Sequence, residues 1–233
     1  MIEAIDLSYE IKKGKDIFAI KNLSMKLEKG YISCLLGHNG AGKTTLMQLL
    51  FAAIKPDGGR ILYKGDEINS KNLHIYHEKV AFVGMEWCVK SMTIRENMAF
   101  LGPLYPDFNE KYFDELAGRI GILDVMDKTY GDLSKGQRAK AEIVFAIARN
   151  PEFIFLDEPL ANLDPVVKTE LVNILVEAAR DKEIGILLST HLLEEVSDIV
   201  DYVVIMENGE IIEIGDRETI FEKHGASRLR EIL

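Results

Sequence analysis

The spacing of apolar side chains changes several times along the chain, and each pattern predicts a different element. Residues 2–27 alternate apolar and polar positions, as half-buried strands do, with residues 12–16 as a turn within them. Residues 31–36 form an apolar run that predicts a central strand covered on both faces. Residues 44–53 have helical composition, and a Pro-Asp-Gly-Gly break separates them from a short strand at residues 60–63.

The pattern becomes mainly helical between about residues 87 and 150. Helical spacing recurs there at residues 95–101, 110–120 and 139–149. This stretch follows a short strand at residues 80–83. We therefore expect a mostly helical subdomain inserted after that strand.

Strands and helices alternate again in the last third of the chain. We expect strands at residues 153–156 and 184–189 on either side of a helix at residues 165–180. A hairpin follows around Asn208-Gly209, because both residue types tolerate positive φ, and the tail at residues 219–233 has helical composition. The alternation predicts an α/β fold whose sheet has a mainly parallel centre.

Composition and charge narrow the possible partners. The 233 residues include 38 acidic and 28 basic side chains, for a formal charge of −10, which argues against broad nucleic-acid binding. The two cysteines, Cys34 and Cys88, form neither a disulfide framework nor a metal-binding pattern, so a reducing setting is the simple interpretation. The start of the chain lacks the layout of a signal peptide, and no apolar run could cross a bilayer. Any membrane role is therefore expected to come through another chain.

The first candidate site is the glycine-rich stretch that follows the strand at residues 31–36. It matches the phosphate-binding loop pattern in full, and its candidate ligand-binding residues are Gly37, Asn39, Gly40, Ala41, Gly42, Lys43, Thr44 and Thr45. Glycines let backbone N–H groups turn inward, and the following helix directs its positive end at the same place. Lys43 adds a charge for the outer phosphates, and the Thr44 hydroxyl is a ligand for Mg²⁺. The alternative is a strand-to-helix turn without a ligand.

Two adjacent carboxylates end the strand at residues 153–156. Asp157 is placed to reach the metal, and Glu158 is placed to polarise the water that attacks the γ-phosphate. Phosphoryl transfer depends mainly on positioning and charge stabilisation, so this placement suits hydrolysis of a nucleoside triphosphate. The alternative is an ordinary acidic turn at the end of a strand.

Three further motifs appear in a particular order. Leu133-Ser134-Lys135-Gly136-Gln137 precedes a long helix, Leu163-Asp164 follows the carboxylates, and Ser189-Thr190-His191 ends the next strand. With these motifs, the chain resembles the ATPase subunit of an ATP-binding cassette (ABC) transporter over essentially its whole length. The resemblance implies one nucleotide-binding domain over residues 1–233, with a phosphate-loop (RecA-like) core and an N-terminal antiparallel β subdomain at residues 1–86 and 151–233. Residues 87–150 would be the helical signature subdomain.

The resemblance also implies a mechanism. Two cassettes would dimerise head to tail around two ATP molecules with Mg²⁺, so that Ser134, Gly136 and Gln137 meet the nucleotide held by the opposite subunit. A helix start with a hydroxyl and free N–H groups suits a γ-phosphate. Asp164 would line the dimer seam and His191 would orient the water. Without a partner, Ser134 and Asp164 are only helix caps.

The chain departs from the family pattern at three places. The second glycine of the signature motif is Lys135 here. The glutamine that meets the metal after the strand at residues 80–83 is absent; Glu86 is our candidate replacement, although Met85 fits the alignment equally well and a plain loop acid is an alternative. The aromatic residue that stacks on adenine aligns with Ile11, and Tyr9 and Phe18 lie nearby. We name Tyr9 as the candidate, because it is the better stacking chemistry, with ordinary strand packing as its alternative. Weak stacking predicts that GTP is accepted nearly as well as ATP.

The partners follow from the resemblance as well. We expect a separate transmembrane permease subunit, a second ABC ATPase subunit forming a homo- or heterodimer, no nucleic acid, and a cytoplasmic, peripheral location on the inner face of the cell membrane. Trp87, Met92 and Tyr105 are candidate docking contacts, or else pack inside the helical subdomain. Residues 102–110 and the signature resemble exporter ATPases of the ABC-2 type, which favours export of a peptide, antibiotic or lipid-like substrate. The alternatives are a soluble ABC ATPase acting on ribosomes or DNA, and an unrelated phosphate-loop kinase or GTPase.

Overall fold

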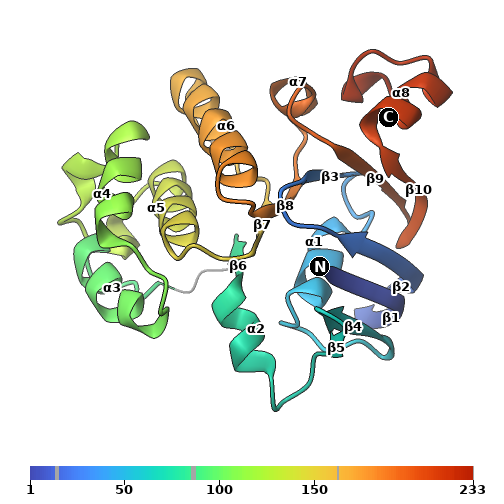
Figure 1. Cartoon of the computed structure of the whole chain (residues 1–233), viewed down its shortest axis with the longest axis horizontal. Coiled ribbons are helices and arrows are strands. Elements are labelled where there is room, and N and C mark those ends of the chain that lie inside the picture. Colours follow the sequence, from blue (N-terminus) through green and yellow to red (C-terminus); the bar gives the residue numbers. More distant parts are fainter. Residues whose placement is uncertain (14–15, 85–87, 162, 233) are drawn as a thin grey trace.

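The computed structural model describes residues 1–13, 16–84, 88–161 and 163–232. Two β-sheets and the helices around them make up this part of the chain (Figure 1). In the view of Figure 1 the strands of the N-terminal sheet lie at the right, and helices α3, α4 and α5 lie at the left, beyond strand β6. The predicted α/β class is therefore confirmed.

The larger sheet carries the central strand that the apolar run predicts. Its strand order is β10-β9-β3-β8-β7-β6. The strands are β3 (Ile32–Leu36), β6 (Val80–Val83), β7 (Phe153–Asp157), β8 (Gly185–Ser189), β9 (Tyr202–Glu207) and β10 (Glu210–Asp216). All neighbouring pairs are parallel except the β9–β10 hairpin. Every residue of β3 and β8 is buried, as expected for strands with helices or a second sheet on both faces.

The N-terminal sheet is antiparallel, as the alternating pattern predicts. Its strand order is β2-β1-β4-β5, and the strands are β1 (Ile2–Lys13), β2 (Asp16–Leu27), β4 (Gly58–Tyr63) and β5 (Asp66–Glu67). Its apolar face joins a core that also contains Leu46 of helix α1 (Lys43–Leu50) and Phe155 of β7. Helix α1 therefore lies between the two sheets, and the loop before it is held from both sides.

One helix on this side is absent from the sequence prediction. Helix α2 (Leu73–Lys79) lies between β5 and β6, and its only fully buried member is Tyr76. The Tyr76 hydroxyl donates a hydrogen bond to the Leu50 carbonyl oxygen at 2.5 Å, which joins α2 to the end of α1. A single anchoring side chain leaves no apolar stripe in the sequence, and the helix is therefore hard to predict from periodicity.

Three longer helices form the helical part of the chain. They are α3 (Ile94–Leu101), α4 (Glu110–Arg119) and α5 (Lys135–Ala148), and each begins at a residue whose side chain accepts a backbone N–H: Thr93, Asn109 and Ser134 respectively. Their apolar faces share one core with helix α6 (Pro165–Arg180) and with the sheet. The helical segments predicted at residues 95–101, 110–120, 139–149 and 165–180 are thus all present.

The C-terminal segment packs against the end of the sheet. Helix α7 (Leu193–Val196) and helix α8 (Arg217–His224) follow β8 and β10, and a short 3-10 helix covers Leu229–Glu231. Leu229 is fully buried, and its N–H donates to the Ser197 hydroxyl at 3.2 Å. The helix predicted at residues 219–233 starts earlier and ends at Gly225, whose φ is +60°. Within the described ranges, no helix is long and apolar enough to span a membrane.

Candidate functional site

The glycines at residues 37–42 shape the loop between β3 and α1. Gly37 has φ +148°, and a Cβ there would lie 2.4 Å from the Met206 carbonyl oxygen. Gly42 has φ +107°, and a Cβ there would lie 2.7 Å from the Phe18 ring. Both positions therefore require glycine. Gly42 is also the N-cap of α1 and makes no side-chain cap, so the N–H groups at the start of this helix face the loop.

Lys43 holds its charge inside the same loop. It is only 8% exposed, and its Nζ donates to the carbonyl oxygens of Gly37 at 2.6 Å and His38 at 3.1 Å. Carbonyl acceptors orient the ammonium group without neutralising it. The loop thus presents a positive charge next to a helix N-terminus, which is the arrangement that binds phosphate groups.

A carboxylate from the sheet meets the start of α1. The Thr44 hydroxyl donates to Asp157 Oδ2 at 2.6 Å, and the Ser189 hydroxyl donates to Asp157 Oδ1 at 2.6 Å. Asp157 and Ser189 are register partners at the ends of the parallel strands β7 and β8. A hydroxyl and a carboxylate are the oxygen donors that Mg²⁺ prefers. The described residues contain no group of three or more His, Cys, Asp or Glu side chains able to hold a metal.

Glu158 is held in an unusual backbone conformation beside His191. Its φ is +52°, and its N–H donates to the Ser189 carbonyl oxygen at 3.1 Å. One carboxylate oxygen accepts the His191 backbone N–H at 3.2 Å, and the other lies 3.1 Å from His191 Nε2. A glutamate at positive φ is strained, and strain of this kind gathers at functional sites. The carboxylate and the imidazole thereby lie next to each other.

These groups surround one cavity of about 500 Å³. The residues that line it are Ile11, Phe18, Asn39, Gly40, Gly42, Lys43, Thr44, Thr45, Asp157, Glu158 and His191. Gly37 and the buried Ala41 also belong to the loop but do not line the cavity. We call this assembly the phosphate side; it contains the predicted loop residues, both carboxylates and His191, although they come from distant parts of the sequence.

The wall of the cavity beyond the loop differs from our expectation. Of the described residues, Ile11 and Phe18 line it and Tyr9 does not. Tyr9 is partly buried against the core between the two sheets. Ile11 and Phe18 face each other as register partners on β1 and β2. The sequence analysis named Phe18 as a neighbour of this place but preferred Tyr9, whereas the position of Phe18 across the predicted turn from Ile11 favours it as the cavity residue.

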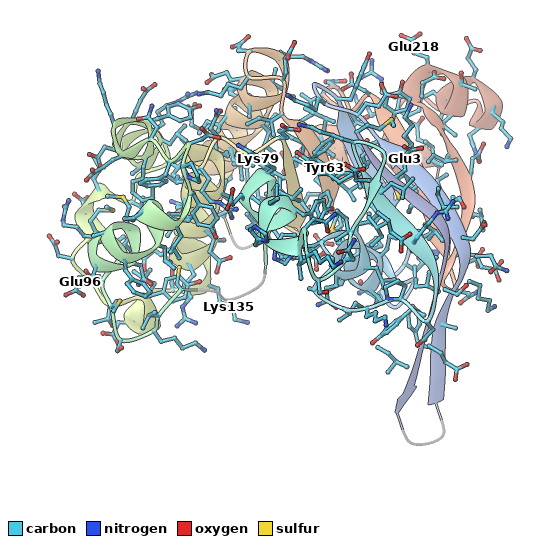
Figure 2. The ribbon with its side chains drawn as sticks, turned by 60° about the horizontal axis from the view of Figure 1, so that its bottom comes forward. Glu3, Tyr63, Lys79, Glu96, Lys135 and Glu218 are labelled. Atoms are coloured by element: carbon cyan, nitrogen blue, oxygen red, sulfur yellow. The ribbon has the colours of Figure 1, made fainter. Side chains whose placement is uncertain are left out.

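The signature residues lie elsewhere, at the start of α5. Ser134 and Gln137 form a capping box: Ser134 Oγ accepts the Gln137 N–H at 3.2 Å, and Gln137 Oε1 accepts the Ser134 N–H at 3.0 Å. Ser134, Gly136, Gln137 and the Asp164 cap of α6 do not line the cavity. Figure 2 shows Lys135 on the helical part of the molecule, with Glu218 at the opposite end. We call Ser134–Gln137 with Asp164 the signature side.

Asp164 joins the two helices of the signature side. Its Oδ1 accepts the Val167 N–H at 3.0 Å, and this hydrogen bond holds the pKa of the carboxyl below its usual value. Lys140 Nζ on α5 lies 3.8 Å from the other carboxylate oxygen. The predicted metal ligand Glu86, with Met85 and Trp87, lies outside the described residues.

Comparison with known proteins decides the family. A family model described as "ABC transporter" matches residues 20–161, which is more than half of the chain and includes the phosphate loop, the signature motif and both carboxylates. The chain belongs to the ABC transporter family. It is an ATP-binding subunit and an ATPase of that family, as the sequence predicted.

The ABC relatives cover nearly the whole chain. It is 30% identical to the ABC transporter ATP-binding protein NatA of Bacillus subtilis (strain 168) over 237 residues, covering 100% of this chain and 96% of that protein. It is 33% identical to the energy-coupling factor transporter ATP-binding protein EcfA2 of Latilactobacillus sakei subsp. sakei (strain 23K), covering 93% of this chain and 78% of that protein. It is 31% identical to the methionine import ATP-binding protein MetN 2 of Pseudomonas aeruginosa (strain UCBPP-PA14), covering 95% of this chain and 69% of that protein.

Solved ABC structures agree with the fold. The ATP-binding subunit of an ABC transporter superposes with a TM-score of 0.86 at 25% identity, covering 100% of this chain and 97% of that one. A dimeric post-hydrolysis cassette bound to ADP and Pi superposes with a TM-score of 0.82 at 21% identity, covering 93% and 99%. The second likeness shows the fold alone, and the expected phosphate-loop core with its mainly parallel sheet is confirmed.

Proposed function

We propose that this chain works with a second ABC ATPase subunit to drive a separate membrane subunit, and that ATP hydrolysis requires residues from both ATPase subunits. The observation that carries the proposal is the separation of the two sides. The phosphate side gathers Lys43, Asp157, Glu158 and His191 around one cavity, whereas Ser134 at its exposed helix start lies outside it. A second subunit in the opposite orientation would bring a signature side to each cavity.

On the phosphate side, Lys43 and the N–H groups of the loop and α1 bind the phosphates of ATP. Thr44 and Asp157 would hold Mg²⁺, which supplies positive charge against the phosphate oxygens. Glu158 accepts a proton from the attacking water, and the contact with His191 keeps its carboxylate facing the cavity. The rate enhancement comes from placing these groups before the reaction begins.

On the signature side, the Ser134 hydroxyl and the N–H groups at the start of α5 would meet the γ-phosphate held by the other subunit. The capping box already fixes the Ser134 backbone and side chain. The helix N-terminus offers partial positive charge, which favours an anion. ATP would then hold the two subunits together, and hydrolysis would release them.

The helical part offers a surface for the membrane subunit. A cavity of about 560 Å³ is lined by Met98, Ala99, Gly102, Pro103, Tyr105, Pro106, Phe108 and Glu110. Phe100 and Leu104 beside it are 57% and 60% exposed. Tyr105 also packs inward, with the Arg149 guanidinium carbon 3.5 Å from its ring centroid. An exposed apolar surface of this kind suits an apolar segment of a partner.

We further propose export and a peripheral place on the inner face of the membrane. The resemblance of residues 102–110 and of the signature motif to exporter ATPases supports this direction. MetN 2 is named for methionine import, so the family alone leaves the direction open. We also propose the division into a core at residues 1–86 and 151–233 and a helical subdomain at residues 87–150.

The deciding experiment captures the partner. Tagged Glu158→Gln protein, loaded with ATP, is added to detergent-solubilised native cells, and the bound proteins are identified by mass spectrometry. Recovery of a polytopic membrane protein supports the proposal and names the subunit that determines the substrate. Recovery of ribosomal or DNA-repair components without a membrane protein supports the rival class of ABC ATPases.

A further inference from the structure

A carboxylate lies buried in the middle of helix α5. Glu142 is only 5% exposed, and its neighbours Ala141, Ile143 and Val144 are buried as well. Burial of a carboxylate is costly unless hydrogen-bond donors satisfy it. An apolar side chain would suit this place in the core better. Packing alone therefore does not explain why a carboxylate is present at this position.

In the part of the chain that the structure describes, donors from two different segments hold the Glu142 carboxylate. The buried Tyr130 hydroxyl donates to Oε1, and the Gly84 backbone N–H donates to Oε2 at 3.3 Å. The negative charge also acts on its surroundings: burial, and then the charge of Glu142, raise the pKa of the Cys88 thiol to about 12. Glu142 thus fixes one backbone group of the segment that follows β6.

Gly84 lies beside Asp157, whose carboxylate accepts the Thr44 hydroxyl. It follows the last residue of β6, where Val83 is the register partner of Leu156 on β7. Its φ is +111°, and a Cβ there would lie 3.3 Å from the Cβ of Asp157. A shift of the Gly84 backbone would therefore press on Asp157 and on the Thr44 hydroxyl that contacts it.

We propose that Glu142 is a positioning residue for ATP hydrolysis, which fixes Asp157 through the Gly84 backbone and links it to the position of helix α5. This inference rests on the proposed function, in which Ser134 meets the nucleotide of the other subunit. Ser134 and Glu142 lie about two turns apart at one unbroken helix. Engagement of Ser134 moves α5 as a unit, and Glu142 carries that movement to the phosphate side.

The test compares three substitutions at one position in the full-length protein. Glu142→Leu removes both acceptors, Glu142→Asp keeps the charge on a shorter side chain, and Glu142→Gln keeps the length and one acceptor oxygen. We expect the Glu142→Leu and Glu142→Asp variants to lower kcat about tenfold or more, because small misplacements of reacting groups lower the rate strongly. We expect Gln to retain most of the activity. KM for ATP stays within about twofold in all three, since the phosphate loop is untouched.

The thermal midpoint separates positioning from folding. Glu142→Leu leaves the Tyr130 hydroxyl and the Gly84 N–H without this acceptor, so we expect its Tm to fall moderately. The kcat of each variant is therefore measured well below its own midpoint, where the protein is folded. Ile143→Val is the matched core control on the same helix, and it should leave kcat unchanged. The proposal is overturned if folded Glu142→Leu is fully active, or if Ile143→Val lowers kcat as much as Glu142→Leu does.

Two further measurements distinguish failure of this inference from failure to fold and from failure of the proposed function. If Glu142→Leu does not fold, the Asp and Gln variants decide: the proposal requires Gln to be the more active, and an equal or reversed order overturns it. Gel filtration of Glu158→Gln with ATP tests the dimer separately. A monomer there contradicts the proposed function, whereas a dimer together with a fully active Glu142→Leu contradicts only this inference.

Discussion

The phosphate side and the signature side are built in different ways. On the phosphate side, charged groups of both signs approach one cavity from the ends of β3, β7 and β8, and each is fixed by hydrogen bonds to its neighbours. On the signature side, Ser134 and Asp164 only cap their own helices, and Lys140 lies 3.8 Å from Asp164. The first contains the groups needed to bind a triphosphate. In the proposed function, the second offers a helix start to the ATP held by the other subunit.

This difference indicates how one chain can act in a pair. The phosphate side can hold ATP without a partner, because its charged groups already surround the cavity in the single chain. An exposed helix N-terminus binds an anion only when the anion is brought to it. Two copies, or two related chains, can therefore supply each other with the missing half.

The largest effect is expected at Lys43. Lys43→Ala removes the buried charge at the centre of the loop, and we expect ATP hydrolysis to fall at least about a hundredfold. Binding of a fluorescent ATP analogue and release of phosphate measure the two steps. Lys64→Ala, which removes a lysine paired with Glu152 instead, is the control and should behave like the unmodified protein. Near-normal turnover of Lys43→Ala would contradict the assignment of the phosphate loop.

The next effect separates binding from chemistry. Glu158→Gln keeps the shape of the side chain but loses the proton acceptor, and turnover should fall by about two to four orders of magnitude while ATP still binds. ATP should convert this variant to a dimer in gel filtration. Glu210→Gln, at a carboxylate paired with Lys21, serves as the control. If ATP leaves Glu158→Gln monomeric, either the two-sided arrangement is wrong or a different partner subunit is needed.

Ser134 tests whether the signature side serves the other subunit. Ser134→Ala should leave ATP binding to the isolated chain intact and lower turnover about tenfold, beyond the roughly 1 kcal/mol of stability lost with a helix cap. Asn109→Ala removes the equivalent cap of α4 and should lower stability without affecting turnover.

Mixing two defective chains gives a stricter form of this test. In a mixed pair of Lys43→Ala and Ser134→Ala chains, one site has both defects and the other has neither. Turnover of the mixture should therefore exceed that of either variant alone. Differential tags demonstrate that mixed pairs form. If the turnover of the mixture does not then exceed that of both variants measured alone, each chain hydrolyses ATP by itself.

A smaller effect is expected at the far wall of the phosphate side. Phe18→Ala removes the aromatic ring from the cavity wall, and the dissociation constants for ATP and GTP should both rise about two- to tenfold, as expected for loss of an aromatic contact. Inorganic triphosphate, which has no base, should bind as before. Tyr9→Ala is the matched control; if it weakens ATP binding more than Phe18→Ala, our sequence-based choice of Tyr9 is the better one.

The smallest effect concerns the brace between α4 and α6. Arg119 donates to Glu170 at 2.6 Å and to both oxygens of Glu177 at 2.6 and 2.8 Å, and the arginine lowers the pKa of Glu177. A lowered pKa stabilises the fold above the ordinary glutamate value of 4.5, and this contribution is lost as the pH falls through the folded-state pKa.

The brace is partly exposed, so its stabilisation should be about 1 kcal/mol or less. Arg119→Ala should lower Tm at pH 7 more than at pH 3, with turnover at pH 7 little changed. An equal loss of Tm at both pH values would show that the arginine acts through packing.

The sequence predicts best what neighbouring residues determine. The loop around Lys43, the central strand before it and the helix from Pro165 to Arg180 all follow from local patterns, and the structure contains each of them. The motif order even predicts that Asp157 and His191 approach the loop, because parallel strands end at the same edge of a sheet.

Contacts between distant segments were harder to predict. That Phe18 and not Tyr9 lines the cavity depends on how β1 pairs with β2. The buried Glu142 carboxylate accepts hydrogen bonds from groups that precede it by many residues. Helix α2 depends on one tyrosine packed against the end of α1. Such features arise from three-dimensional pairing and leave little periodic signal in the sequence.

The position of β3 in the larger sheet has a consequence for synthesis of the chain. Ile32 on β3 is the partner of Ile186 on β8, and Ser33 is the partner of Tyr202 on β9. The strand that carries the phosphate loop is therefore made early and paired late, and at roughly 5–20 residues per second it waits about 8 to 30 seconds for its neighbours. Long-range parallel pairing of this kind is slow and exposes apolar strands in the meantime. The nascent chain should thus be unable to hold ATP until β8 and β9 have left the ribosome.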